Sequence, residues 1–369
     1  MRYTLGHFTT HRKNLLHQIG LYCPSVCEEK LQNPQSERLP TYFKSCPELV
    51  HDYEKLSHNR GVLLNLNADQ TKLIKILSEN NINVPERSSI DVYNPSIIFS
   101  HKNSECIAGR VELSDKQSEH NSLVVFFKFK NGQWIPLSKP VYRLQDPNIT
   151  WIGNQMLFAG VKLAAGEKKG EANYRMAFYS GKDFQNLTEF AEGPWGMKGT
   201  RIVGLKNGKI GVYTRPQGIK GGEGNIGFTM IDSISDFEKD PKSIIDNAPL
   251  LITRFLLGQW GGLNQIIPLS NTENIIIGHF AYRNPRNERK YFPCKFTHNF
   301  ETGEIKNMEI LAQRSDFPEG PAKAPDLIDI TYPAGIINRY NKWYLIAGLS
   351  DTRSGMIEVE NPMSENQKK

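Results

Sequence analysis

A repeated pattern of short β-rich runs constrains the fold of this 369-residue chain more than any other feature. From residue 90 onward, apolar strand-like runs alternate with turns rich in Gly, Asn and Pro, and their alignment gives five similar units. Each unit opens on a polar residue, continues into an apolar strand, turns, and returns in a strand that ends near Gly or Ala. The opening residues, with spacings of 52, 55, 63 and 62, are Asn94, Asp146, Arg201, Asn264 and Asp326.

This repeat predicts an all-β fold, a five-bladed β-propeller. One small antiparallel sheet cannot bury both of its faces, whereas sheets packed around an axis bury those of their neighbours. The innermost strand of each blade lines the central channel, so the five opening residues should converge at one mouth. A β-sandwich is the alternative, but it does not predict a polar residue at the same phase of every unit. Pro147, directly after Asp146, fits the start of a strand, where it removes no ladder hydrogen bond.

The region before the repeat has a different texture. Residues 67–83 have the pattern of one amphipathic helix, which Asn67 or Asp69 can cap. The apolar face of this helix comprises Leu73, Ile74 and Leu77. The predicted divisions are an N-terminal extension that is partly helical or disordered (1–65), the helix and lead-in (66–89), the propeller (90–363) and a polar tail (364–369).

Charge and hydropathy narrow the range of partners. The net charge is +6 and the sequence pI is about 8.9, but the basic residues are scattered, which argues against nucleic-acid binding and leaves room for a small anion such as phosphate or a sugar nucleotide. No run of about 18 apolar residues occurs, and the N-terminus has no apolar signal region, so we expect no membrane association. Five cysteines in so long a chain favour a reducing, cytoplasmic compartment.

Two motifs invite functions that the sequence does not support well. Cys23, Cys27 and Cys46 with His51 loosely suggest zinc, but their spacing is not that of paired CxxC knuckles, and free thiols are the simpler interpretation. The run from Gly222 to Gly227 matches the dinucleotide fingerprint G-x-G-x-x-G, yet the sequence after it, FTMIDSI, reads as a strand rather than a helix. We therefore expect a tight glycine loop that approaches a ligand or a neighbouring blade.

Charged and aromatic side chains gather at the predicted strand ends. The basic ones are Arg110, Lys198, Arg201, Arg215, His279, Arg283 and Lys323. Together they suit an anion, because a phosphate takes several charge-assisted hydrogen bonds. Trp151, Trp195 and Trp260 can stack on a sugar ring or pack between blades. Asp146 and Asp326 are candidates for acid–base chemistry, and further acids near strand starts, Asp91, Glu112 and Asp329, leave a two-carboxylate glycosidase open.

Several of these runs resemble a known family. The segments GPWGMKGTRIVGLKNGKIGVYTRPQG, GGEGNIGF, WGGLNQIIPL, IIGHFAY and FPEGPAKAPDLIDI are similar to the β-1,2-mannosyltransferase–phosphorylases of glycosyltransferase family 108, long known as a domain of unknown function. That family shares a five-bladed propeller with the mannoside phosphorylases of glycoside hydrolase family 130. The resemblance covers roughly residues 90–352.

The resemblance implies inverting chemistry on β-1,2-linked mannose. The acid or base of the family is the Asp of a Leu-Glu/Gln-Asp-Pro motif, here Asp146. The implied phosphate ligands are Lys198, Arg201, His279 and Tyr282, and the implied sugar ligands are Asn94, Arg110, Asn264, Lys323 and Asp326. The donor is mannose 1-phosphate or GDP-mannose, the partners are mannose-containing oligosaccharides and phosphate, and neither a metal nor another cofactor is expected.

The chain departs from the family pattern at three positions. Gln265 and Gly199 stand where the family pattern has an acid, and Ala324 stands where it has a basic residue. These positions bear on the choice of acceptor. The alternatives to a phosphorylase or transferase are a glycosidase on the same propeller and a sugar-binding propeller without activity.

Overall fold

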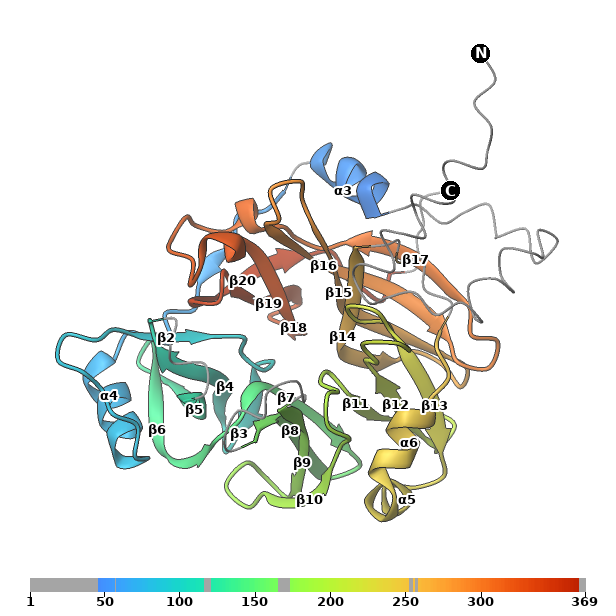
Figure 1. Ribbon diagram of the computed structural model, residues 1–369, viewed down its shortest axis with the longest axis horizontal. Helices are drawn as coiled ribbons and strands as arrows, with labels where there is room; N and C mark the ends of the chain where they lie inside the picture. Colours follow the sequence, from blue (N-terminus) through green and yellow to red (C-terminus); the bar gives the residue numbers. More distant parts are fainter. Residues whose placement is uncertain are drawn as a thin grey trace.

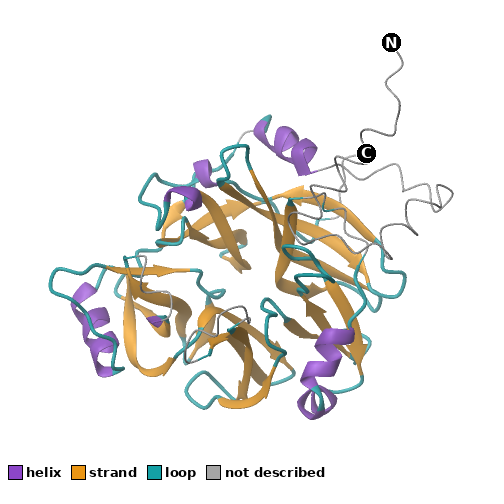
Figure 2. Cartoon of the chain, viewed as in Figure 1, coloured by secondary structure: helices purple, strands orange, loops and turns teal. Residues whose placement is uncertain are grey.

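The described part of the protein is all-β. The computed structural model describes residues 46–56, 58–115, 121–164, 173–251, 255 and 258–364, and about half of them lie in strands (Figure 2). The predicted extension up to residue 45, with Cys23 and Cys27 of the loose zinc pattern, lies outside the described residues, as does the tail from residue 365.

The described strands form four sheets. The first contains β2 (Ile90–Tyr93), β3 (Phe99–His101), β4 (Ser104–Leu113), β5 (Leu123–Lys130) and β6 (Gln133–Tyr142). The second contains β7 (Gln145–Ile152), β8 (Gln155–Leu163), β9 (Tyr174–Gly181) and β10 (Thr188–Glu192). The third contains β11 (Arg201–Gly204), β12 (Ile210–Thr214) and β13 (Gly227–Ile231).

The fourth sheet has eight strands in two antiparallel halves. One half contains β14 (Gln259–Pro268), β15 (Glu273–Arg283), β16 (Arg289–Asn299) and β17 (Ile305–Ile310). The other contains β18 (Asp329–Arg339), β19 (Lys342–Leu349), β20 (Arg353–Val359) and β1 (Val62–Leu63). The halves join only where β16 and β18 run parallel, at Lys290 with Asp329 and Tyr291 with Ile330. β1 lies inside the predicted N-terminal extension. The N-terminal side of the chain therefore adds a strand to the last repeat unit before the chain forms the strands of the first unit.

The sheets surround a common centre (Figure 1). Strands β7, β11, β14 and β18 lie nearest this centre, and contacts run from β4 to β7, β11, β14 and β18 in turn, while β2 contacts β19 and β20. Each of these inner strands opens one of the repeats seen in the sequence. Polar residues at the starts of the repeats are therefore brought toward the same region.

Irregularities in the inner strands change the direction in which particular side chains point. The register between β7 and β8 shifts across Asp146 and Pro147, and that between β14 and β15 shifts at Asn264. A β-bulge bends its strand and changes the direction in which a residue points. The Gln265 side chain, next to the second bulge, donates to the carbonyl of Ile336 at 3.1 Å and accepts from its N–H at 2.7 Å. Gln265 therefore joins β14 to β18, which gives this departure from the family pattern a structural role.

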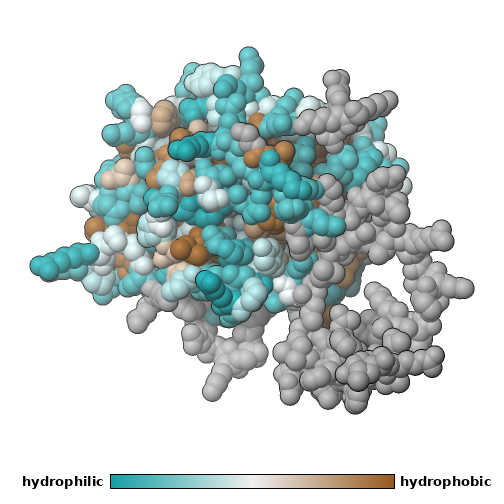
Figure 3. Space-filling view, turned by 90° about the horizontal axis from the view of Figure 1, so that it is seen from above, coloured by the Kyte–Doolittle hydropathy of each residue, from teal (hydrophilic) through white to brown (hydrophobic). Residues whose placement is uncertain are grey.

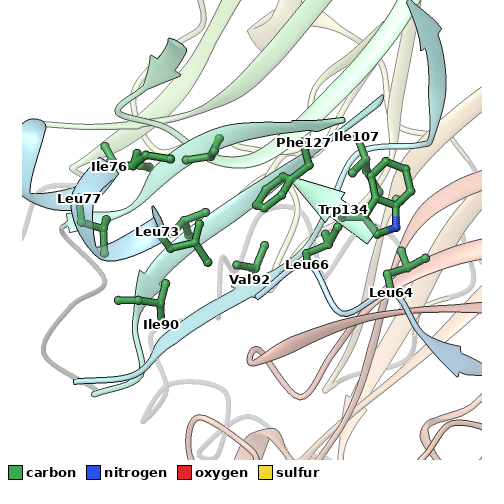
Figure 4. Close-up of a cluster of buried hydrophobic side chains, with 14 of the residues drawn as sticks. Leu64, Leu66, Leu73, Ile76, Leu77, Ile90, Val92, Ile107, Phe127 and Trp134 are labelled. Atoms are coloured by element: carbon green, nitrogen blue, oxygen red, sulfur yellow. The ribbon is translucent and has the colours of Figure 1, made fainter. Parts of the chain in front are cut away.

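The predicted helix is present. α4 (Gln70–Glu79) begins after Asp69, whose carboxylate accepts from the backbone of Lys72. Its buried residues are Leu73, Ile76 and Leu77, whereas Ile74 is partly buried. They pack on the first sheet in the cluster drawn in Figure 4. This packing explains why the helix forms, since a ten-residue helix is marginal alone in water.

The other helices are short. They are α3 (Cys46–Glu54), α5 (Ile234–Lys239), α6 (Pro241–Asn247) and the 3₁₀ turns η2 (Arg314–Asp316) and η3 (Pro325–Leu327). The face in Figure 3 presents mainly hydrophilic side chains with small, separate apolar areas. No helix among the described residues is long and apolar enough to cross a membrane.

A buried polar triad links the third sheet to the fourth. The Tyr213 hydroxyl lies 2.9 Å from Nδ1 of His298, and the Asn274 amide donates to that hydroxyl at 2.8 Å. All three side chains are fully buried. Burial lowers the pKa of His298 from 6.5 to about 4. The imidazole is therefore neutral in the folded protein at pH values where it takes up a proton in the unfolded chain.

We expect this histidine to make the protein less stable in mild acid. Between pH 6.5 and 4 the unfolded chain binds a proton that the folded state does not, so the free energy of unfolding falls as the pH falls, by up to about 3 kcal/mol. Urea unfolding at pH 7 and pH 4.5 measures this fall. His298→Gln should have a smaller fall than the parent protein, and equal falls in the two proteins would contradict the assignment.

Candidate active site

A polar cavity of about 330 Å³ opens at the centre of the ring of sheets. Its described lining includes one group of acids and amides, Asn94, Gln145, Asp146, Gln217, Glu223 and Asp351, and one group of bases, Arg110, Lys198, Arg201, Arg215, His279, Arg283 and Arg289. Trp260, Tyr291 and Tyr332 supply aromatic walls. Six predicted site residues thus share one cavity, namely Asn94, Arg110, Asp146, Lys198, Arg201 and His279.

Asp146 presents a carboxylate to this cavity from the bulge at the start of β7. Its backbone has a φ of 49°, in the left-handed region where Asp and Asn are tolerated best among the non-glycine residues. Oδ1 of the carboxylate accepts from the Asn94 amide at 3.0 Å and from the Arg110 guanidinium at 3.2 Å. Asn94 itself has a φ of 41°. Two strained backbone positions therefore hold a matched donor and acceptor in contact.

The surroundings keep Asp146 ionised. Burial alone would raise the pKa of Asp146, but Arg110, Lys198 and the hydrogen bond from Asn94 outweigh it and hold that pKa below its usual range. At neutral pH in the empty cavity, Asp146 is thus a carboxylate that can accept a proton.

Opposite Asp146 lies a basic cluster, which we define as Lys198, Arg201, Arg215 and His279. The two arginines and the histidine are buried. Backbone carbonyls orient the arginines: Arg201 Nε donates to Asn264 at 3.2 Å, and Arg215 Nε donates to Gly261 at 2.8 Å. The carboxylates of the described residues form no ion pair with any of the four. The basic cluster therefore has the character of an anion-binding site.

His279 is a neutral member of the basic cluster. Burial, and then Arg215, Arg201 and Lys198, hold the pKa of His279 well below its usual value. Nδ1 lies 2.8 Å from Oδ1 of Asn264, an acceptor, so we place the ring proton on Nδ1. Burial and the neighbouring Arg215 also lower the pKa of Lys198. An anion bound here would offset the mutual repulsion and raise both pKa values.

Four predicted ligands, Lys323, Asp326, Tyr282 and Asn264, lie outside the lining. Lys323 is buried in an ion pair with Glu112. Asp326 is on η3 and pairs with Arg289 at 2.8 Å, beside the cavity rather than in it. Tyr282 stacks on Phe292 in an apolar cluster. Asn264 lies behind His279, with a side chain that is 1% exposed, and it supports the imidazole instead of facing the cavity.

The glycine-rich run serves close packing. β13 begins at Gly227, shortly after Gly222 and Gly224, and a strand rather than a helix at this point rules out a dinucleotide-binding strand–helix unit. The carbonyl of Gly224 accepts from Gly261 on the neighbouring sheet at 3.1 Å, and a Cβ at Gly224 would lie 2.7 Å from the Arg215 guanidinium. Glycine in this run therefore allows the backbones of Gly224 and Gly261 and the guanidinium of Arg215 to pack closely together.

Asp351 is a cavity residue that the sequence reasoning did not single out. It follows β19 in a turn, with a φ of 53°. Burial raises the pKa of Asp351 to about 6, with Arg110 opposing the shift and Asp146 adding to it. Its only sequence signal is the polar run Ser350-Asp351-Thr352 after an apolar strand, which is also typical of an ordinary turn.

The three tryptophans lie in different surroundings. Trp260 lines the cavity and donates to the Tyr291 hydroxyl at 3.0 Å. Trp151 packs against Phe99, and Trp195 is 49% exposed beneath the Arg175 guanidinium. Within the described segments, no group of three His, Cys, Asp or Glu side chains is placed to hold a metal ion.

Known protein families bear on the function of this cavity. The model of a family described as "Protein of unknown function (DUF1861)" matches residues 69–365. The chain belongs to the DUF1861 family. No curated protein matches it.

Several solved structures are similar to this DUF1861 member. A mannose phosphorylase from Leishmania mexicana, solved with phosphate, is 27% identical with a TM-score of 0.72, over 86% of this chain and 93% of that one. A GDP-Man-dependent mannosyltransferase from the same organism is 28% identical with a TM-score of 0.72, over 87% and 96%. A β-1,2-mannobiose phosphorylase from Listeria innocua, at 14% identity and a TM-score of 0.55 over 75% and 92%, shares the fold. These matches confirm the family resemblance of the sequence motifs.

Gly262 offers a test of the basic cluster. A Cβ there would lie 2.9 Å from both Arg215 Cδ and His279 Cε1, closer than real contacts allow. We expect Gly262→Ala to displace both side chains and to weaken the binding of inorganic phosphate by about tenfold or more, since each charge-assisted hydrogen bond contributes about 1.5–3 kcal/mol. Calorimetric titration with phosphate measures the change.

The matched control is Gly204→Ala on β11, where the new Cβ would meet Ile152 at an ordinary 3.6 Å. It should bind phosphate as the parent protein does. Equal affinity in the two variants would show that the basic cluster does not hold phosphate.

Proposed function

We propose that the protein is an inverting β-1,2-mannoside phosphorylase or mannosyltransferase, with Asp146 as its general acid and base. The observation that carries the proposal is the placement of Asp146, as an ionised carboxylate, in one cavity with the basic cluster. The similarity to the two Leishmania structures, a mannose phosphorylase and a mannosyltransferase, supports the sugar and the reaction class.

We further propose that the described sheets form a five-bladed β-propeller. The two halves of the eight-stranded sheet count as separate blades, because a two-residue parallel pairing is their only ladder. With the other three sheets they give five antiparallel units around one centre (Figure 1). The pairing of β1 with β20 attaches the N-terminal side of the chain to the last blade.

Phosphorolysis uses the two sides of the cavity together. The basic cluster holds phosphate, one oxygen of which attacks the anomeric carbon of mannose. The bond to the glycosidic oxygen breaks on the opposite face, and that oxygen takes a proton from Asp146 directly or through a sugar hydroxyl. A single displacement inverts the anomeric carbon and yields mannose 1-phosphate. One carboxylate suffices because the anion is itself the nucleophile.

Synthesis runs through the same groups in reverse. Asp146 accepts the proton of the acceptor hydroxyl as that oxygen attacks the anomeric carbon of the donor, and phosphate leaves from mannose 1-phosphate, or GDP from GDP-mannose. The lowered pKa of Asp146 in the empty cavity suits this role as base. For phosphorolysis the proton must be restored, and a bound phosphate favours this because its charge offsets that of Lys198.

A glycosidase is the second candidate, and Asp351 favours it. The Asp351 carboxylate lies in the same cavity and could activate a water molecule, while Asp146 acts as the acid. Hydrolysis would release free mannose without any requirement for phosphate. A sugar-binding protein without activity would instead bind its ligand and turn over no donor. The buried free thiol of Cys106 fits the reducing, cytoplasmic location that we propose.

The deciding experiment supplies mannose 1-phosphate and mannose to the purified protein. Oligosaccharides together with equimolar released phosphate support the proposal, and a parallel reaction with GDP-mannose identifies the preferred donor. Free mannose from β-1,2-mannobiose in phosphate-free buffer would identify the glycosidase instead.

Asp146→Asn should lower turnover at least about a hundredfold, because the amide cannot take up or give a proton and general acid–base catalysis typically contributes 10²–10⁴. The amide retains the shape of the carboxyl group, so thermal unfolding should show an intact fold. Initial rates of phosphate release measure the effect. A rate equal to that of the parent protein would remove Asp146 from the mechanism.

Arg201→Ala should raise the KM for phosphate by roughly ten- to a hundredfold, since it removes a buried charge-assisted donor. The control is Arg143→Ala, at an exposed arginine that donates to the carbonyl of Asn80. Phosphorolysis rates across a phosphate series compare the two. An unchanged phosphate dependence in Arg201→Ala would refute its place in the basic cluster.

A further inference from the structure

A buried carboxylate outside the cavity lining has an unusual number of donors. Glu112, on β4, is fully buried. Its Oε1 accepts from Arg110 Nε at 2.6 Å and from the Ser122 hydroxyl. Its Oε2 accepts from the Tyr93 hydroxyl at 2.8 Å and from the Lys323 ammonium. All four acceptor positions of the carboxylate are thus occupied by protein groups.

Lys323 completes this arrangement. Its side chain is 3% exposed, and its ammonium bonds to the Tyr93 hydroxyl at 3.2 Å as well as to Glu112. The ammonium also lies 4.9 Å from the centre of the Tyr93 ring. A charge so enclosed is placed to act on other protein groups rather than to hold a sugar.

Arg110 connects this pair to the reaction centre. One edge of the guanidinium, Nε and Nη2, faces Glu112 Oε1, and Nη1 donates to Oδ1 of Asp146 at 3.2 Å. The guanidinium is a rigid plane, so fixing one edge fixes the direction of the other. Glu112 therefore determines how Arg110 meets Asp146.

Glu112 and Lys323 also act electrostatically on the Asp351 carboxylate in the cavity. Burial raises the pKa of Asp351 to about 6; Arg110 and Lys323 oppose the shift, while Asp146 and Glu112 add to it. Asp146 is faced by Arg110 from β4, Lys198 from the segment before β11, and Asn94 from the end of β2. Glu112 is faced by Arg110, Lys323 and Ser122. Tyr332, on β18, feels the charge of Asp146.

We propose that Glu112 and Lys323 are positioning residues: a buried charge pair that orients Arg110 and balances its charge, and so sets the proton occupancy of Asp146 and Asp351. The role of Asp146 as acid and base is taken from the proposed function. Stability alone gives no reason for such a pair, because a buried ion pair is often no more stabilising than apolar residues of the same size.

The test compares three variants that change charge and keep size. Glu112→Gln removes the negative charge, Lys323→Met removes the positive one, and the double variant removes both. Protein with ¹³C-labelled Asp carboxyl groups is titrated by NMR between pH 4 and 8, with Asp146→Asn and Asp351→Asn identifying the two resonances. Thermal unfolding checks the fold of each variant.

The expected shifts have opposite signs. Glu112→Gln should lower the titration midpoint of Asp351 by roughly half a pH unit to one unit, and Lys323→Met should raise it by a similar amount, as expected for a neighbouring charge. In Lys323→Met the midpoint of Asp146 should move upward as well. The double variant should return close to the parent midpoints, which a merely structural role does not predict.

Shifts of the same sign in the two single variants, or no shift in Lys323→Met, would overturn the inference. If Glu112→Gln does not fold because it leaves a buried ammonium without its partner, Lys323→Met and the double variant still decide through the midpoint of Asp351, which lies inside the titrated range. The pH profile of kcat/KM for mannose 1-phosphate should move with the NMR midpoints. A parent protein without transfer activity would refute the proposed function, whereas the NMR titration would still judge the charge pair.

Discussion

The structure depends on holding several positive groups close together in a buried place without a carboxylate among them. Burial, together with the charges of Arg215, Arg201 and Lys198, keeps His279 neutral, and burial and Arg215 lower the pKa of Lys198. Backbone carbonyls offset part of the repulsion between these positive groups, because Asn264 accepts from Arg201 and Gly261 accepts from Arg215. A backbone carbonyl carries no net charge, so the net positive charge of the basic cluster remains and can attract an anion. The surrounding sheets prevent the cluster from relaxing by moving apart.

Backbone conformations with positive φ at three cavity residues help to form the pocket. Asp146 lies at a bulge with positive φ, Asn94 has positive φ at the end of β2, and Asp351 has it in the turn after β19. Positions of this kind cost of order 1–3 kcal/mol each and persist only where the surroundings fix them. They place three polar side chains in the cavity lining from a bulge, a strand end and a turn. The pocket is thus built from departures from ideal β-structure.

The repeat in the sequence was sufficient to predict the all-β class and four of the five opening residues as neighbours around the centre. It failed for Asp326, because that residue is on a 3₁₀ turn and pairs with Arg289 beside the cavity. Lys323 was expected at the sugar, but its partner Glu112 is more than two hundred residues away in the chain, a contact that no local pattern reveals. Asp351 was missed because only the openings of the units were compared, whereas it lies in a turn between their later strands.

Asp146 and Asp351 lie in one cavity and yet differ in proton affinity. Burial alone would raise the pKa of Asp146, but the charges of Arg110 and Lys198, and then the hydrogen bonds from Asn94 and Arg110, outweigh it. For Asp351 burial prevails, because Arg110 and Lys323 lower its pKa while the negative charges of Asp146 and Glu112 raise it. Lys198 and the direct hydrogen bonds to Asp146, together with the acids that face Asp351, therefore separate the two groups. Such a separation allows one carboxylate to remain a base near neutral pH while the other holds a proton in mild acid, in a pocket only about 330 Å³ in volume.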